Sequence, residues 1–206
     1  EFRRVLFRSR TARYSSGSGS SSLVFTYTIQ AGDSDADGIS INANSISLNA
    51  GTIADNAGNA ATLTHASVAN NASYLVDTTA PTVTISDNAA GTLKAGDTVT
   101  FTFSESVTGF DTSKVTVANG SKGTFSGSGT TYTLVVTPTA SSTGNITVNL
   151  STSGVTDAAG NQATAPAQYT QAYDTIAPTV TISDNAAGTL KAGDTVTFTF
   201  TFSESV

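Results

Sequence analysis

Apolar residues alternate with Thr, Ser and Asn through the middle of the chain, from residue 83 to residue 150. A period of two gives a strand one apolar and one polar face, so this alternation predicts half-buried β-strands. Glycine-rich turn signals separate the runs, and no stretch of convincing length shows helical spacing. We expect an all-β protein with strands near residues 82–86, 98–104, 114–118, 131–137, 145–150 and 167–173, and a seventh strand that the pattern does not locate.

An internal repeat sets the domain organisation. Residues 77–103 recur at 174–200, displaced by 97 positions, and only Thr79 against Ile176 differs among the 27 pairs. Solenoid units span about 20–50 residues, so this period fits a duplicated small domain. Seven short strands in such a unit indicate an Ig-like fold. The sequence predicts tandem Ig-like antiparallel β-sandwiches: the C-terminal half of one repeat at 23–76, a complete repeat at 77–173 and the N-terminal part of a third at 174–206.

The two ends of the sequence need a separate interpretation. Residues 1–9, EFRRVLFRS, resemble the in-frame translation of a short-read sequencing adapter, and residues 1–13 hold five Arg against four Lys in all the rest. We interpret residues 1–13 as adapter-derived or disordered sequence, and we expect residues 1–9 to have no packed partners. We interpret the Ser/Gly run at 14–22 as a flexible segment. The extra Thr201-Phe202 pair near the other end preserves the alternation and therefore identifies no error.

Composition narrows the class of protein. Cysteine is absent, so an extracellular form needs a substitute for disulfides, such as a metal ion or an isopeptide from Lys94, Lys114 or Lys122 to an Asn. Residues 14–206 hold fourteen acids against four Lys, which argues against nucleic acid and anionic membrane as partners. No run of 18 apolar residues occurs, so we expect no membrane insertion of this segment.

Three acids are expected to meet at one end of the complete repeat. In a seven-strand antiparallel sandwich, the connections after the second and sixth strands lie at the end where the chain enters. Glu105 follows the second strand in FSESV, Asp157 follows the sixth in TDAAGN, and Asp77 belongs to the entering linker DTTAP. Clustered carboxylates repel one another unless a cation neutralises them, so this convergence favours a Ca²⁺ site.

A second acidic motif precedes the linker. Residues 33–38 read D-x-D-x-D-G, with Asp33, Asp35 and Asp37 spaced as in the first half of an EF-hand calcium loop. Position twelve of that pattern is Asn44 where an EF-hand has Glu, so further ligands would have to come from elsewhere. The same argument from strand direction (strand polarity) places this loop at the end of its repeat that faces the linker holding Asp77.

The candidate ligand set therefore spans two junctions. The third repeat carries Asp174 and Glu204 at the positions of Asp77 and Glu105. The alternative is that all these acids are solvated turn residues, because Asp favours turns for local hydrogen-bonding reasons. Asp87 and Asp97 are expected to be turn formers, although Asp87 could serve the junction at Asp174.

The segments DTTAPTVTI, FTFSESV and VTDAAGNQA resemble bacterial Ig-like repeats of very large biofilm-associated and RTX-type adhesins. The resemblance covers residues 23–206. It implies a stalk whose joints are stiffened by calcium, on an extracellular protein that is exported by type I secretion and held at the bacterial cell surface. It also implies two kinds of partner: neighbouring repeats of the same chain, and a surface or host ligand bound by a tip domain outside this sequence.

Catalysis is not expected. His65 is the only histidine, no nucleophile is placed beside it, and the chain lacks the Trp that sugar-binding clefts use. A second reading makes these repeats an accessory array of a secreted polysaccharide-active or proteolytic enzyme. A third makes the repeats themselves the ligand binder. Many further repeats with a secretion signal would favour the stalk, and one catalytic domain would favour the accessory array.

Overall fold

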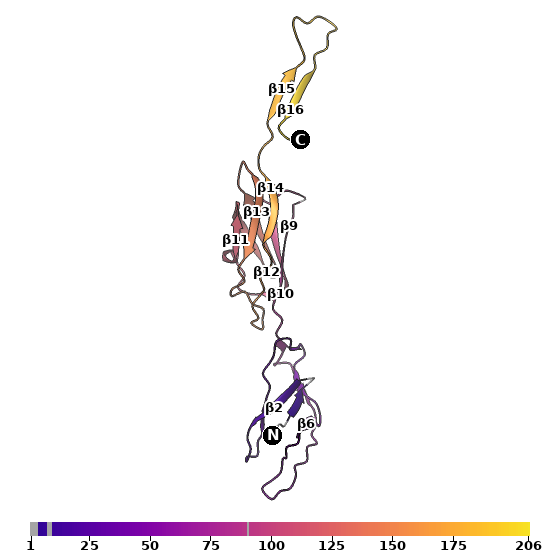
Figure 1. Ribbon diagram of the computed structural model, residues 1–206, viewed down its shortest axis with the longest axis vertical. Helices are drawn as coiled ribbons and strands as arrows, with labels where there is room; N and C mark the ends of the chain where they lie inside the picture. Colours follow the sequence, from indigo (N-terminus) through magenta and orange to yellow (C-terminus); the bar gives the residue numbers. More distant parts are fainter. Residues whose placement is uncertain (1–3, 8–9, 90) are drawn as a thin grey trace. The chain divides into compact units, whose positions relative to one another are not determined.

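The computed structural model describes residues 4–7, 10–89 and 91–206 (Figure 1). Strands dominate, and the one helical element of the described residues is the short 3-10 turn η1 (Thr112–Lys114). No helix of the described residues has the length and apolar character needed to cross a membrane. The chain divides into two compact units, Glu1–Pro81 with Thr156–Gln162, and Thr82–Val155 with Ala163–Val206.

Two three-stranded antiparallel sheets form the sandwich of the complete repeat (Figure 1). One sheet has the order β12-β10-β9 and the other β11-β13-β14. This grouping is that of an Ig-like sandwich, and it confirms the six strands located from the sequence. Their bounds are β9 (Val83–Asp87), β10 (Thr98–Val107), β11 (Val115–Ala118), β12 (Gly120–Pro138), β13 (Thr143–Leu150) and β14 (Tyr169–Asp174).

The core lies between these sheets, where the alternation predicted it. Val99, Phe101 and Leu134 have no exposed surface, and apart from Pro81 the buried hydrophobic residues of the described chain fall between positions 83 and 173. Phe110 and Tyr132 meet edge to face, with ring centroids 5.0 Å apart. The buried Tyr132 hydroxyl donates to the carbonyl of Val107 at 3.1 Å, so its polar end is satisfied.

Strand β12 contains the seventh strand that the sequence pattern did not locate. It turns back on itself at Gly127, whose φ of 119° is a conformation that favours glycine. A Cβ at Gly127 would collide with the carbonyl of Thr131 on the returning leg. The first leg, GSKGTFS, escaped notice because its glycines interrupt the alternation of apolar and polar side chains.

The first unit begins with a hairpin of the same kind. Strand β2 (Arg10–Ser16) pairs antiparallel with β3 (Val24–Thr26), and Gly17 at the turn has a φ of 104°. The Ser/Gly run is therefore a hairpin tip and part of a strand, and its interpretation as a flexible segment is wrong for residues 14–16. Sequence reasoning failed here because short polar residues are common both in linkers and at tight turns.

The N-terminal residues also differ from expectation. Strand β1 (Arg4–Phe7) pairs antiparallel with β2 and with β6 (Ile46–Ser47). The expectation that residues 1–9 lack packed partners is thus wrong for Arg4–Phe7, since the free edge of a strand accepts almost any backbone. Residues 1–3 and 8–9 lie outside the described part.

Residues 22–41 of the first unit correspond in structure to residues 131–150 of the complete repeat. Both segments turn at a residue of positive φ, Gly32 at 86° and Ser141 at 51°. In both segments, the carbonyl of the residue after the turn accepts a hydrogen bond from a threonine hydroxyl of the following linker. Thr78 donates to Asp33 and Thr175 donates to Ser142, each at 2.9 Å. The paired strands of the first unit are β4 (Ser34–Asp35) with β8 (Val76–Asp77), and β5 (Ile39–Ile41) with β7 (Val68–Asn71).

The third repeat contributes one hairpin, β15 (Val180–Asp184) with β16 (Phe198–Phe202). Val180 pairs with Phe202 just as Val83 pairs with Phe103. The two extra residues of this repeat are therefore absorbed in the hairpin loop, between Asp194 and Thr197, and the paired strands keep their faces. An insertion of two residues preserves the period of a strand, which is why it left no trace in the pattern.

Candidate metal centre

Asp77 ends strand β8 and opens the linker to the complete repeat. Its Oδ1 accepts a hydrogen bond from the amide of Thr79 at 2.9 Å, which starts a local turn. Pro81 follows and restricts both itself and Ala80 to extended geometry. The Asp77 carboxylate is exposed, so its second oxygen has room for a ligand.

Asp157 is held by the loop D-A-A-G-N at residues 157–161. Its side chain is only 5% exposed. Oδ1 accepts from the amide of Asn161 at 2.9 Å, and Oδ2 accepts from the Asn161 side-chain amide at 2.8 Å. The same Asn161 amide donates to the carbonyl of Asp77 at 3.1 Å. One asparagine therefore orients the Asp157 carboxylate and fastens the linker beside it.

The electrostatics of Asp157 favour its charged form. Burial raises the pKa of this carboxyl, but the hydrogen bonds from Asn161 and from the amides of Gly160 and Ala159 outweigh burial, and the net shift is downward. Asp157 is thus a carboxylate at neutral pH, the state that a hard cation requires of an oxygen ligand.

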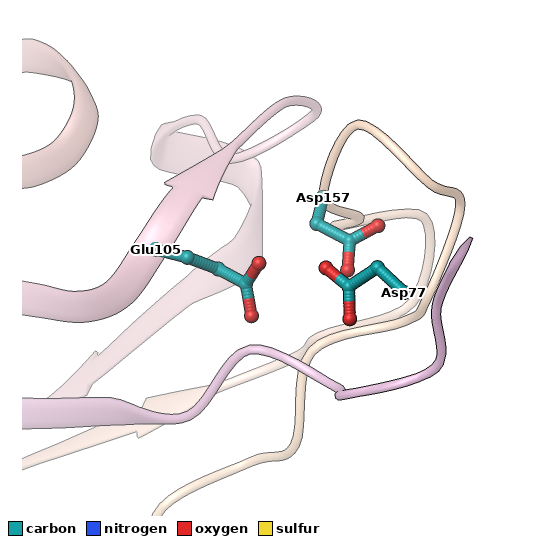
Figure 2. A group of neighbouring side chains, drawn as sticks. All are labelled: Asp77, Glu105 and Asp157. Atoms are coloured by element: carbon teal, nitrogen blue, oxygen red, sulfur yellow. The ribbon is translucent and has the colours of Figure 1, made fainter. Parts of the chain in front are cut away.

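Glu105 on β10 completes the group. Asp77, Glu105 and Asp157 each offer a carboxylate oxygen within 4.8 Å of the others, and Figure 2 shows the three carboxylates turned toward one another. Ca²⁺ holds its oxygen ligands at about 2.3–2.6 Å, so oxygens that share one ion lie within roughly 5 Å of each other. The donor set and its spacing fit that cation. The convergence predicted from strand polarity is therefore present in the structure.

The acidic loop of the first unit is placed differently. Its backbone reaches the linker, because Ser34 pairs with Asp77 and Asp35 with Val76. Its side chains, however, do not join the group of three, which is the one cluster of this kind among the described residues. The role of these acids as ligands stays a prediction.

Each of these acids is engaged by protein groups. Asp33 accepts from the Tyr27 hydroxyl and the Gln30 amide, both at 2.7 Å, and pairs with the Arg10 guanidinium at 2.6 Å. The Gln30 amide, the Tyr27 hydroxyl and Arg10 together lower the pKa of Asp33 despite its burial. Asp35 accepts from the amide of Gly38 at 2.8 Å, and Asp37 accepts from the Asn70 side chain at 2.7 Å.

The second predicted junction is less complete. Asp174 accepts from the amide of Ile176 at 2.9 Å, as Asp77 does from Thr79, and both Asp174 and Glu204 are exposed. No third acid joins them in the described part of the chain. The counterpart of Asp157 would belong to the second half of the third repeat. Their role as ligands also stays a prediction.

Sequence reasoning missed the orienting role of Asn161 and of its counterpart Asn59 in the first unit. Asp55 accepts from the amide of Asn59 at 2.8 Å and from the Asn59 side chain at 2.8 Å, which reproduces the contacts of Asp157 with Asn161. The side-chain bond of Asn59 leads the causes that lower the pKa of Asp55. The shared spacing D-x-x-G-N was the signal that could have identified both loops.

The remaining candidates have structural roles. His65 Nε2 accepts from the amide of Ser45 at 3.0 Å. The ammonium groups of Lys114 and Lys122 donate to the backbone carbonyls of Ser153 and Thr112, at 2.7 and 2.8 Å, and these contacts offer no Asn side chain for an isopeptide.

Asp87 and Asp97 are turn formers in the structure, as expected. Asp97 Oδ2 accepts from the amide of Lys94 at 2.7 Å. Asp87 accepts from the amide of Ala89 at 2.6 Å and from the hydroxyl of Tyr169, which ties the turn to strand β14. Neither belongs to the acidic group of three.

Comparison with known protein families identifies the complete repeat. Residues 77–173, the complete repeat with all three clustered acids, match the family model described as bacterial Ig-like domain. Searches of curated proteins and of solved structures gave no match. The boundaries of the matched segment coincide with those of the repeat derived from the sequence. Together with the two-sheet architecture, this match identifies residues 77–173 as a bacterial Ig-like domain.

Proposed function

We propose that this chain is a stalk segment of a secreted bacterial surface adhesin, in which Ca²⁺ at the start of each repeat stiffens the array and no catalysis takes place. The observation that carries the proposal is the convergence of Asp77, Glu105 and Asp157 at the linker of a duplicated bacterial Ig-like domain. An array of nearly identical domains gains length or copy number from duplication, whereas an active site gains little from it.

The three acids have distinct positions that suit this role. Asp77 belongs to the linker, Glu105 to strand β10 and Asp157 to the loop before β14. A bound Ca²⁺ would neutralise the mutual repulsion of these carboxylates. Asn161 holds the linker and Asp157 in place for that purpose, through its bonds to the Asp77 carbonyl and the Asp157 carboxylate. A linker that depends on such a site is stiff where calcium is plentiful and slack where it is scarce.

The location outside the cell follows from the same chemistry. Extracellular modules bind Ca²⁺ with dissociation constants of about 10⁻⁴–10⁻³ M, which suits a medium that contains millimolar calcium. The chain lacks cysteine, so metal ions would serve where small secreted domains use disulfides. Adhesion and biofilm formation are the roles that the sequence resemblance adds to this physical argument.

The test is a calcium titration of the 206-residue chain, in which binding is measured by calorimetry or by competition with a chromophoric chelator. The wild type is expected to bind in the submillimolar to millimolar range, and Glu105→Gln and Asp157→Asn are expected to weaken binding at one site. Asp111→Asn is the matched control, because Asp111 caps η1 by accepting from Ser113 and lies outside the group of three. Binding that is unchanged by both Glu105→Gln and Asp157→Asn would contradict the proposed site.

A further inference from the structure

The first and last strands of the complete repeat are joined to each other, although they belong to different sheets. Asp87, the last residue of β9, accepts a hydrogen bond from the hydroxyl of Tyr169, the first residue of β14. Beyond the end of β9, the carbonyl of Gly91 accepts from the side-chain amide of Gln171. Tyr169 and Gln171 are two positions apart on a strand, so both side chains lie on the face of β14 that meets this segment.

Leu93 makes the next contact and shows the relative direction of the two segments. Its amide donates to the carbonyl of Ala172 at 2.9 Å, and Leu93 and Tyr173 form a parallel β-bridge. Both side chains are buried in the core. Residues 87–93 therefore run beside residues 169–173 in the same direction, with their contacts in the same order. We call the contacts of Asp87, Gly91 and Leu93 with β14 the end-strand bridge.

The parallel direction decides how this bridge carries tension. The chain enters the repeat through the linker before β9 and leaves it after Asp174, the last residue of β14. A pull on the entering chain and an opposite pull on the leaving chain therefore slide one segment along the other. All contacts of the bridge then carry load at once and must break together. Pulling both segments from the same end would break the contacts one after another.

We propose that the end-strand bridge is a force-bearing clamp, through which the complete repeat resists tension applied along the array. The direct route from the entering chain to the leaving chain crosses this bridge, whereas the aromatic contact of Phe110 with Tyr132 lies outside it. Forced unfolding is governed by the rate of unfolding. The clamp therefore lengthens the lifetime of the folded domain under load, in addition to the stability that the core provides.

The need for a clamp rests on the proposed stalk function, in which each repeat carries tension. The clamp itself is a property of one domain, and its contacts include none of the three clustered acids. Measurements of force can therefore be made in excess chelator, where the proposed calcium site makes no contribution. The clamp can fail while calcium binding stands, and calcium binding can fail while the clamp stands.

Two attachment geometries test the direction of loading. The wild-type chain has no cysteine, so the 206-residue chain can be given two unique thiol handles for optical tweezers. Thr82→Cys with Ile176→Cys pulls the two segments from opposite ends, whereas Ala95→Cys with Ile176→Cys pulls them from the same end. All three positions are exposed. The released length, about 3.5 Å for each residue between the handles, identifies the unfolding of the complete repeat.

We expect the lifetime at a given force to be at least several-fold longer with the Thr82 handle than with the Ala95 handle. A matched pair of tyrosine variants then tests the contacts. Tyr169→Phe removes a hydroxyl of the bridge, and Tyr132→Phe removes the hydroxyl that donates to a carbonyl outside it. Tyr169→Phe should lower the ratio of the two lifetimes, and Gln171→Glu, which loses the amide donor, should lower it as well. Tyr132→Phe should shorten both lifetimes alike and leave their ratio unchanged.

The ratio of lifetimes separates the clamp from general stability, because a substitution that only weakens the fold acts in both geometries. Equal lifetimes with the two pairs of handles would overturn the inference. A ratio that Tyr169→Phe and Tyr132→Phe change by the same factor would overturn it as well, because the hydroxyl of the bridge would then have no special part in bearing the load.

Discussion

Asn161 joins two acids of the candidate centre through one side-chain amide, which donates to Asp157 Oδ2 at 2.8 Å and to the carbonyl of Asp77 at 3.1 Å. These hydrogen bonds therefore hold the linker against the loop without a cation. Fixing ligands in advance lowers the entropic cost of bringing them around an ion, as outer-shell partners do in other metal sites.

Replacing this asparagine should weaken calcium binding without removing a carboxylate. We expect Asn161→Ala to lower the affinity of the chain for Ca²⁺ by about 10–100-fold, the usual effect of losing a residue that orients a ligand. Isothermal titration in calcium-free buffer measures this change. Asn59→Ala is the matched control, since Asn59 makes the same bonds to Asp55, which belongs to no acidic group of three among the described residues. Equal losses in both variants would assign the effect to loop folding.

The stability of the chain should depend on the protonation of Asp157. The folded-state pKa of this carboxyl is lower than its unfolded value of about 3.9, so its charge stabilises the fold above that value. The contribution is lost as pH falls through the lowered folded pKa. Urea unfolding of the wild type and Asp157→Asn in chelator should give a difference in unfolding free energy that shrinks from neutral pH toward pH 2. A difference that is constant with pH would contradict this account.

The fold was largely predictable because a period of two is a strong local signal. Val99, Phe101 and Phe103 alternate with threonines, and all three are buried as that period requires. The first leg of β12 and strand β2 were missed because Gly and Ser mark tight turns as readily as linkers. Pairing of β1 with β2 leaves no signal in hydrophobicity, since it depends on a free backbone edge.

The candidate site was predictable only in part. The direction of the strands in the fold predicted that Asp77, Glu105 and Asp157 meet, although they lie in three segments that are distant in sequence. The structure shows these three acids together. The orientation of individual side chains is decided by local partners, which the direction of the strands does not determine. Asp33 turns to Tyr27 and Arg10 for this reason.

The same substitution in two repeats should have very different effects. Phe101→Ala removes a fully buried ring from the complete sandwich and should cost about 3–5 kcal/mol of unfolding free energy. Phe200→Ala changes a largely exposed ring and should cost less than about 1 kcal/mol in dilute solution. Thermal or urea unfolding at low protein concentration measures both. Comparable losses would show that the third-repeat hairpin is packed in a manner that differs from this structure.

Calcium-dependent stiffening is the central claim, and small-angle X-ray scattering of the 206-residue chain tests it most directly. The measurement uses dilute monomeric protein, first with millimolar Ca²⁺ and then with excess chelator. We predict that chelation changes the maximum dimension and raises the flexibility seen at high angle, and that Asp77→Ala in calcium reproduces the chelated wild type. Asp174→Ala, the corresponding linker acid without a third partner in the described chain, should behave as the wild type. Scattering curves that are the same with calcium and with chelator would contradict the account.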